Sequence, residues 1–115
     1  MRRWNGWGDS ATTMELPAQG ADFLQSLVGR GQVLPDASLD EVMAQVPPSR
    51  LPAHQLVSVD AETRVRHARG QSLPDWLAMR SGDFGVFPDG VAFPESAADI
   101  RELLAWAKTE NIVVI

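Results

Sequence analysis

Only a few side chains in this 115-residue sequence have the type and spacing that chemistry requires. His54 and His67 are the two histidines, they lie in different segments, and the chain contains no cysteine. Protein metal sites combine histidine, cysteine and carboxylate ligands at short, regular spacing, as on an HExxH helix. Neither that motif nor a set of carboxylates at ligand spacing is present, so the sequence predicts no metal site.

The serines and the neighbouring carboxylates are explained by helix capping rather than by catalysis. Ser38, Ser72 and Ser96 each stand directly before a helical pattern, where a serine hydroxyl accepts a hydrogen bond from a free backbone N–H. No GxSxG elbow is present. Three acidic residues are also close in sequence, namely Asp36, Asp40 and Glu41. They belong to a turn and a cap, so they form no acid/base pair. We therefore expect no catalytic, cofactor-binding or metal-binding residue in this chain.

A glycine pair offers a first possibility for binding phosphate. Gly29 and Gly31 resemble part of a dinucleotide-binding fingerprint, but Leu34 replaces the third glycine. A helical pattern also precedes the pair, where the fingerprint needs a strand. We interpret these glycines as a helix terminus.

A basic cluster in an otherwise acidic chain offers a second possibility. It consists of Arg64, Arg66, His67 and Arg69. Such a cluster could meet a phosphate or an acidic partner surface. We favour the alternative that these residues form a solvated helix face before the helix stops at Gly70.

Composition narrows the class of protein. Hydrophobic residues make up 44% of the chain, which is ordinary for a globular protein. The net charge of −5 argues against non-specific nucleic-acid binding, which needs a surplus of lysine and arginine. The lack of cysteine fits a reducing compartment, and no apolar run approaches the roughly 18 residues of a membrane span. We expect a cytoplasmic protein without a transmembrane segment.

The C-terminal third of the chain has the clearest element signals. A short apolar run, Val91–Phe93, predicts a strand, and Ser96 followed by Asp99 predicts a capped helix over residues 97–109. Ile112–Ile115 is a β-branched run that suits a strand covered on both faces. We predict a βαβ crossover with the two strands parallel. Its helix should bury one apolar face, made of Ile100, Leu103, Leu104 and Ala107.

The preceding residues predict an arm and several short helices. Residues 1–19 have no periodicity, and we expect Trp4 and Trp7 to dock on another part of the protein. Helical patterns follow over residues 20–28, 39–46, 61–68 and 73–81, with a flexible linker at residues 47–55. Residues 56–59 are interpreted as a turn that enters a helix. We divide the chain into an arm and helical segment, residues 1–84, and the start of an α/β domain, residues 85–115.

A resemblance to a known family covers nearly the whole chain. Pro88–Ile115, PDGVAFPESAADIRELLAWAKTENIVVI, resembles the opening βαβ unit of the flavin-binding domain in the vanillyl-alcohol oxidase and para-cresol methylhydroxylase superfamily. The string RWNGWG at residues 3–8, HARGQS at residues 67–72 and MRSG at residues 79–82 resemble the alkyldihydroxyacetonephosphate synthase family within it.

The resemblance implies a fold, a cofactor and an activity. The expected fold is α+β or α/β, a mostly helical N-terminal segment leading into a flavin-binding domain. The expected cofactor is FAD, whose pyrophosphate loop would lie beyond Ile115, so no family site residue can be assigned to this chain. The implied reaction exchanges the acyl group of a lipid-like substrate for a long-chain alcohol, and we expect the fragment alone to be inactive.

Two alternatives stay open. One is an FAD-linked oxidase or dehydrogenase that acts on an alcohol or a 2-hydroxy acid. The other is a non-catalytic helical interaction module. In either case the exposed apolar run Ile112–Ile115 predicts self-association through a C-terminal strand.

Overall fold

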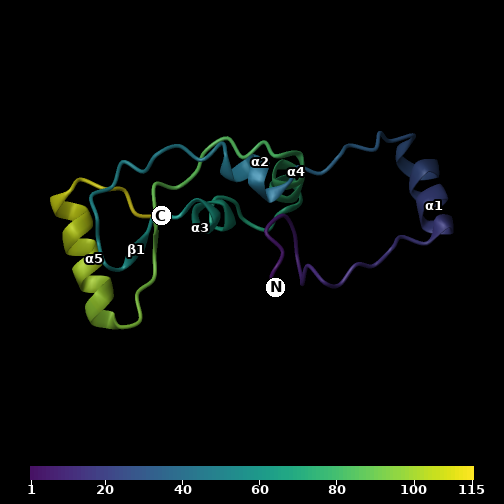
Figure 1. The fold of residues 1–115 in the computed structure, drawn as a ribbon. Coiled ribbons are helices and arrows are strands. Elements are labelled where there is room, and N and C mark those ends of the chain that lie inside the picture. Colours follow the sequence, from purple (N-terminus) through teal and green to yellow (C-terminus); the bar gives the residue numbers. More distant parts are fainter.

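The structure is a computed structural model that describes residues 1–115. Five helices and two short strands follow one another along the chain. The helices are α1 (Ala18–Val28), α2 (Leu39–Met43), α3 (Ala61–Arg66), α4 (Leu73–Ser81) and α5 (Ala97–Thr109), and the strands are β1 (Val57–Ser58) and β2 (Val91–Ala92). The molecule is elongated, with extents of 56 × 27 × 24 Å, and α1 and α5 lie at its two ends (Figure 1). None of the helices is long and apolar enough to cross a bilayer.

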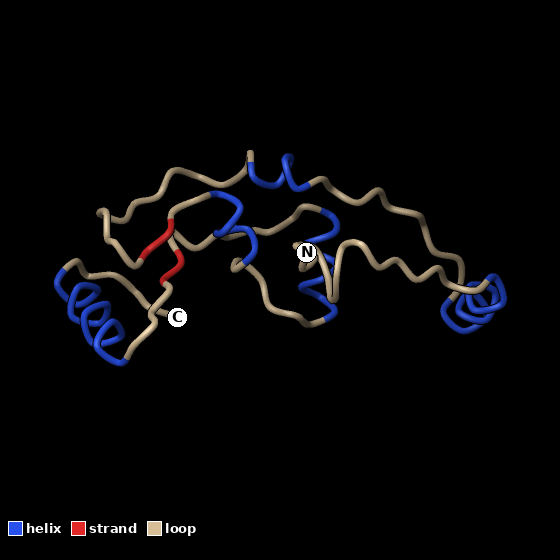
Figure 2. Tube along the Cα trace, turned by 60° about the horizontal axis from the view of Figure 1, so that its bottom comes forward, coloured by secondary structure: helices blue, strands red, loops and turns tan.

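The sheet confirms an α+β fold but differs from the predicted crossover. β1 and β2 pair antiparallel, with Val57 opposite Ala92 and Ser58 opposite Val91 (Figure 2). Residues 56–59 therefore contribute a strand, and their interpretation as a turn was wrong. Ile112–Ile115 forms no strand, so the predicted parallel pair with Val91–Phe93 is absent. The backbone N–H and carbonyl groups of β2 instead form their hydrogen bonds with β1, which precedes α3 in the chain.

Local capping explains the position of α5, which matches the predicted helix. Ser96 accepts a hydrogen bond from the Asp99 N–H, and the Asp99 carboxylate accepts one from the Ser96 N–H, so the capping box is complete. At the other end Asn111 adopts the left-handed conformation, with φ of 56°, and the Ile112 N–H donates to the Ala107 carbonyl. This hydrogen-bond pattern is that of a Schellman motif, which ends a helix without glycine.

The predicted burial of α5 holds only in part. Ala107 is buried and Leu103 is half-buried, but Ile100 and Leu104 are exposed, and Trp106 contributes to the covered side. The physical reason is that the two-stranded sheet is too small to cover a full helix face. Part of the apolar stripe therefore faces outward.

The largest apolar cluster lies in the middle of the molecule, away from the sheet. Val42, Val65, Met79 and Phe84 are its fully buried members, contributed by α2, α3, α4 and the segment after α4. α4 ends as predicted at Gly82, which adopts the left-handed conformation with φ of 78°. α2 and α3 are shorter than their patterns predicted, since they stop at Met43 and Arg66. This cluster organises residues 36–87 and leaves both ends of the molecule thinly packed.

The first helix is separate from this body. α1 stands at the tip of a long arm, reached by one extended segment and left by another (Figures 1 and 2). None of its residues is buried. Its C-terminus at Gly29, with φ of 83°, agrees with the interpretation of the Gly29 and Gly31 pair as a helix terminus.

Candidate functional site

A broad concave surface beside α5 is an apolar groove, which we call the α5 groove. It has a volume of about 980 Å³ and is lined by α5, by β2 with the segment before it, and by residues 111–115. Hydrophobic side chains dominate its wall. Leu104, Val113 and Val114 are 54%, 84% and 62% exposed, so the groove presents bare apolar surface rather than a closed pocket. Such a surface is suited to packing against another apolar surface.

One ion pair fixes the rim of the α5 groove. The Arg50 guanidinium donates three hydrogen bonds to the Asp89 carboxylate, the shortest at 2.6 Å from Nη2 to Oδ2. These bonds hold the pKa of Asp89 below its usual range. Both side chains line the groove, and both charges are satisfied within the chain. The pair joins the linker after α2 to the turn before β2.

The predicted basic cluster is not a solvated helix face, and that interpretation was wrong. Arg64 is only 2% exposed, although it lies on a six-residue helix. Its Nε donates to the Pro88 carbonyl at 2.6 Å, and its Nη1 donates to the Pro47 carbonyl at 2.7 Å. Arg69 donates to the Phe84 carbonyl in the same manner. These arginines therefore connect loops, because a guanidinium offers five donors in a fixed plane.

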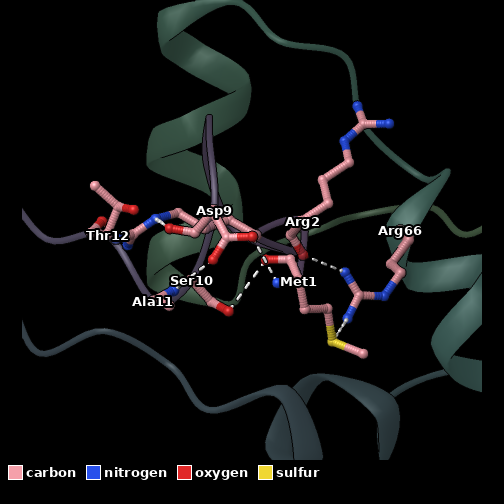
Figure 3. Close-up of polar contacts among 8 residues, drawn as sticks. Met1, Arg2, Asp9, Ser10, Ala11, Thr12 and Arg66 are labelled. Atoms are coloured by element: carbon pink, nitrogen blue, oxygen red, sulfur yellow. Dashed lines mark hydrogen bonds and ion pairs between the residues drawn. The ribbon is translucent and has the colours of Figure 1, made fainter.

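Arg66 connects the body to the first residues of the chain. Its Nη1 donates to the Arg2 carbonyl at 2.9 Å (Figure 3). Its Nε and Nη2 donate to Glu62 one turn earlier. Next to it the N-terminal ammonium group of Met1 lies 2.6 Å from Asp9 Oδ2. That contact and the Ala11 N–H keep the pKa of Asp9 below its usual range. The first twelve residues thus close into a small ring against α3.

The two N-terminal tryptophans have different surroundings. Trp4 stacks on Phe84, with 6.2 Å between ring centroids, and packs against the central cluster. Its docking is therefore confirmed. Trp7 lies at the tip of the ring and is 79% exposed, so within this chain it docks on nothing.

The N-termini of α2, α3, α4 and α5 are closed by the chain's own side chains. The N-caps Ser38, Ser72 and Ser96 each take part in a complete capping box, and Asp60 caps α3 by accepting from the Thr63 N–H. The carboxylates of Glu41 and Asp75 accept hydrogen bonds from these serines, which lowers the pKa of both groups. The pKa of Asp99 is lowered first by the Glu95 N–H and then by Ser96. An anion at any of these ends would compete with a carboxylate that is already bound.

The two histidines serve as packing residues at different places. His54 packs on Trp106, with ring centroids 4.6 Å apart, and its Nδ1 accepts from the Leu56 N–H. His67 Nδ1 lies 2.8 Å from the Thr63 carbonyl, to which it donates. No group of three or more histidine and acidic side chains is arranged to hold a metal ion. Asp36 pairs with Arg80 instead of joining Asp40 or Glu41.

Comparison with known proteins finds similarity both in sequence and in structure. The sequence is 26% identical over 149 residues to an alkyldihydroxyacetonephosphate synthase from Dictyostelium discoideum, an alignment that covers 98% of this chain and 24% of the relative. A solved structure of an alkyldihydroxyacetonephosphate synthase superimposes with a TM-score of 0.73 at 21% identity, over 99% of this chain and 27% of that one. No family model matches the sequence.

These two comparisons agree with each other and with the family resemblance of the sequence. The structural match, at 21% identity, shows the fold alone, and the sequence match, at 26% identity, shows similarity to one part of such a synthase. The chain spans about a quarter of the length of the relative that it matches. Over nearly all of its residues, the chain is thus similar in sequence and fold to one part of an alkyldihydroxyacetonephosphate synthase.

Proposed function

We propose that this chain is the N-terminal part of an FAD-dependent enzyme that resembles alkyldihydroxyacetonephosphate synthase. The sequence similarity over 98% of the chain supports the proposal, together with the fold shared over 99% of it. The reaction of the intact enzyme would exchange the acyl group of an acyl-dihydroxyacetone phosphate for a long-chain alcohol. A bound flavin would supply an electrophilic centre for that exchange without net oxidation. A small-molecule or lipid substrate and a cytoplasmic location belong to the same proposal.

Within such an enzyme the chain's own contribution is structural. We assign residues 1–84 to an arm and helical segment and residues 85–115 to the start of the FAD-binding domain. The α5 groove supports this assignment, because Val113 and Val114 expose apolar surface that further strands of a flavin domain would cover. The Arg50–Asp89 pair and the Arg64 bond to Pro88 join the two parts across residue 85.

The residues present do not fit an FAD molecule on their own. A pyrophosphate needs several convergent backbone N–H donors at a glycine-rich turn or at a helix N-terminus. α2, α4 and α5 already direct those donors at Glu41, Asp75 and Asp99 or their serine caps. No step of the reaction is therefore assigned to a residue of this chain.

A flavin titration tests the proposal. FAD is added to the purified 115-residue chain while flavin fluorescence is followed, and in parallel to a chain extended by the sequence that follows Ile115 in its gene. We expect no saturable binding to the short chain and a yellow, flavin-loaded product from the extended one. Saturable micromolar binding to the short chain would contradict the statement that residues 1–115 hold no FAD site. A colourless extended chain would contradict the proposal that the intact protein is a flavoenzyme.

The exposed apolar groove favours one alternative function, a non-catalytic interaction module. In that case the α5 groove would take an apolar partner surface rather than the strands of a flavin domain. The same extended chain separates the two functions. In the flavoenzyme the groove residue Val114 becomes protected from hydrogen exchange when the chain is extended, whereas in a module it stays as exposed as it is here.

A further inference from the structure

One asparagine of the chain is followed by glycine, and this pair, Asn5 and Gly6, lies in the small ring that the first twelve residues form. An asparagine side chain can be attacked by the backbone nitrogen of the next residue, which closes a five-membered succinimide. Glycine favours this reaction, because it has no Cβ atom to hinder the attack and its backbone adopts many conformations. The contacts of the two residues decide whether the folded chain permits it.

The structure leaves both reacting groups of this pair free. Asn5 and Gly6 lie in the bend at residues 4–8, outside the helices and strands. The bend is closed by other groups, since the Arg3 N–H donates to the Gly8 carbonyl at 3.0 Å. Neither the Gly6 N–H nor the Asn5 side chain takes part in a hydrogen bond. A Cβ atom on Gly6 would meet only Arg3 Cδ, at 3.9 Å, so the backbone here is not enclosed.

A second pair of the same type, Asp89 and Gly90, is held in place. The Arg50 guanidinium donates to both carboxylate oxygens of Asp89, at 2.6 to 3.2 Å. It also keeps the pKa of Asp89 below its usual range, and a charged carboxylate is a poor electrophile. A Cβ atom on Gly90 would lie 2.7 Å from Val57 Cγ1, so its neighbours enclose this glycine. The fold therefore protects this pair from succinimide formation.

The other asparagine of the chain, Asn111, is protected in a different way. The nitrogen that would attack it belongs to Ile112, whose N–H donates to the Ala107 carbonyl at 2.8 Å. That hydrogen bond ends α5 and must break before the nitrogen can react. The β-branched side chain of Ile112 adds steric hindrance. Of the three pairs, the fold leaves one open.

We propose that Asn5 is a site of spontaneous deamidation in the folded chain. The Gly6 nitrogen forms a bond to Asn5 Cγ, the Cγ–Nδ2 bond breaks, and ammonia leaves with the proton of the Gly6 N–H. Water then opens the succinimide at one of its two carbonyl carbons. Attack at Cγ gives aspartate, and attack at the main-chain carbonyl gives isoaspartate. Each product carries one new negative charge, and the reaction needs no oxidant or reductant.

The isoaspartate product changes the ring that carries Trp4. Its main chain runs through Cβ and Cγ, so one more atom enters the backbone between the Arg3 N–H and the Gly8 carbonyl. The hydrogen bond between these two groups closes the bend, and a longer backbone no longer fits it. Trp4 directly precedes the modified residue and stacks on Phe84 of the central cluster. Isoaspartate therefore loosens the first twelve residues from the body, whereas aspartate keeps the backbone length and leaves them in place.

Peptide mapping of the 115-residue chain, stored at neutral pH and sampled over weeks, tests the site. A parallel sample in urea gives the rate of each pair in the unfolded chain. Chromatography of the peptides separates isoaspartate from aspartate, which have the same mass. We expect Asn5 to react in the folded chain within about threefold of its rate in urea. At Asp89 and Asn111 folding should slow the reaction by at least about tenfold, because local opening must come first.

Gly6→Ala is the matched variant, since the added Cβ atom has space and Asn5 is retained. We expect it to slow the deamidation of Asn5 by about tenfold, because the Cβ atom hinders the attack. Gly31→Ala, at another open glycine, should leave the rate unchanged.

Hydrogen exchange of the Arg3 amide tests the consequence for the ring. Freshly purified Asn5→Asp should protect this amide as well as the unmodified chain does, because the backbone length is the same. The isolated isoaspartate form should lose the protection.

Four results would overturn the proposal. The first is an Asn5 that folding slows by more than about threefold, and the second is an Asp89 or Asn111 that folding does not slow. The third is a Gly6→Ala chain that deamidates at the unchanged rate. The fourth is an isoaspartate form with a protected Arg3 amide, which would refute the effect on the ring. None of these measurements involves FAD, so this proposal and the flavoenzyme fail independently.

Discussion

Single arginines hold segments of this chain together that regular structure does not connect. Arg64 is the most buried of them, and both of its hydrogen bonds go to carbonyl groups of distant loops. A buried cation is costly to desolvate, so removing it would recover some free energy. The two carbonyls would then lose their donors, at about 1 to 3 kcal/mol each. The second effect is the larger one at this site.

We therefore predict that Arg64→Met lowers the free energy of unfolding by about 2 to 4 kcal/mol. Urea unfolding followed by circular dichroism measures the change. Arg101→Met on α5 is the control, since that arginine is exposed and its replacement should stay within about 0.5 kcal/mol. Similar midpoints for the two variants would show that the Arg64 bonds contribute nothing.

The capping carboxylates make the stability depend on pH. Hydrogen bonds from the Glu95 and Ser96 N–H groups hold the pKa of Asp99 below its usual range. A group whose pKa is lower in the folded state stabilises it above the unfolded pKa and loses that effect as pH falls through the folded pKa. The stabilising effect of Asp99 is therefore present at pH 7 and is lost below about pH 4.

A comparison of the chain with Asp99→Asn checks this dependence. At pH 7 we expect the variant to unfold at a lower temperature, because an amide holds the two N–H groups less well than a carboxylate. At a pH well below 3.8 the carboxyl of Asp99 becomes protonated, and the difference between the two unfolding temperatures should shrink. A difference of equal size at both pH values would mean that the cap does not act through its charge.

Sequence reasoning worked at the residue scale wherever an interaction was local. Ser38, Ser72 and Ser96 were predicted as caps because each partner lies three residues away, and all three form. The burial of Arg64 was missed because its acceptors, at Pro47 and Pro88, lie 17 and 24 residues away. No periodic pattern marks an arginine whose partners are backbone carbonyls.

At the scale of elements, close backbone approach explains why β1 and β2 can meet. A Cβ atom on Gly90 would lie 2.7 Å from Val57 Cγ1, 2.8 Å from Leu51 Cδ1 and 3.2 Å from the Ser58 carbonyl. Only glycine leaves room for these atoms. The pairing of the two strands thus depends on a missing side chain as well as on hydrogen bonds.

Gly90→Ala should consequently destabilise the chain by about 1 to 3 kcal/mol, the usual cost of overpacking. Gly31→Ala is the matched control, because a Cβ there would meet nothing within 4 Å. That variant should change the free energy of unfolding by less than about 0.5 kcal/mol. Guanidinium unfolding of both variants gives the comparison, and equal effects would refute the close approach.

The same elements show where prediction from sequence failed. The periodicity of α5 and its caps fixed the helix at residues 97–109, in agreement with the structure. Periodicity could not identify the strand that pairs with Val91–Phe93. The segments around Val57 and Ile112 are both short and rich in β-branched residues, so either could form that strand. Strand pairing is a long-range choice, and here the close backbone approach at Gly90 favours pairing with Val57.

The whole molecule is far from compact. Its radius of gyration is 18.3 Å, whereas a compact chain of this length has one of about 13 Å. Five hydrophobic residues are fully buried, four of them in the central cluster. The folded body is therefore small. The arm that carries α1 makes the molecule longer but contributes no buried residue to the hydrophobic core.

Replacing residues 14–34 with a flexible glycine–serine linker of equal length tests this division. We expect the thermal unfolding midpoint of the body, measured on a dilute sample, to shift by less than about 4 °C, which corresponds to under 1 kcal/mol for a domain of this size. The reason is that no residue of α1 is buried. A larger drop would show that the arm packs on the body in solution.

The arginine bonds to backbone carbonyls also bear on how such a fold tolerates change over evolutionary time. A carboxylate partner disappears when its codon mutates, but every residue type presents the same carbonyl oxygen. The residue types at positions 47, 84 and 88 can therefore change while the hydrogen bonds from Arg64 and Arg69 to the backbone carbonyls persist. A fold held together by such bonds requires few fixed residue types. This agrees with the TM-score of 0.73 between this chain and the solved synthase structure at only 21% sequence identity.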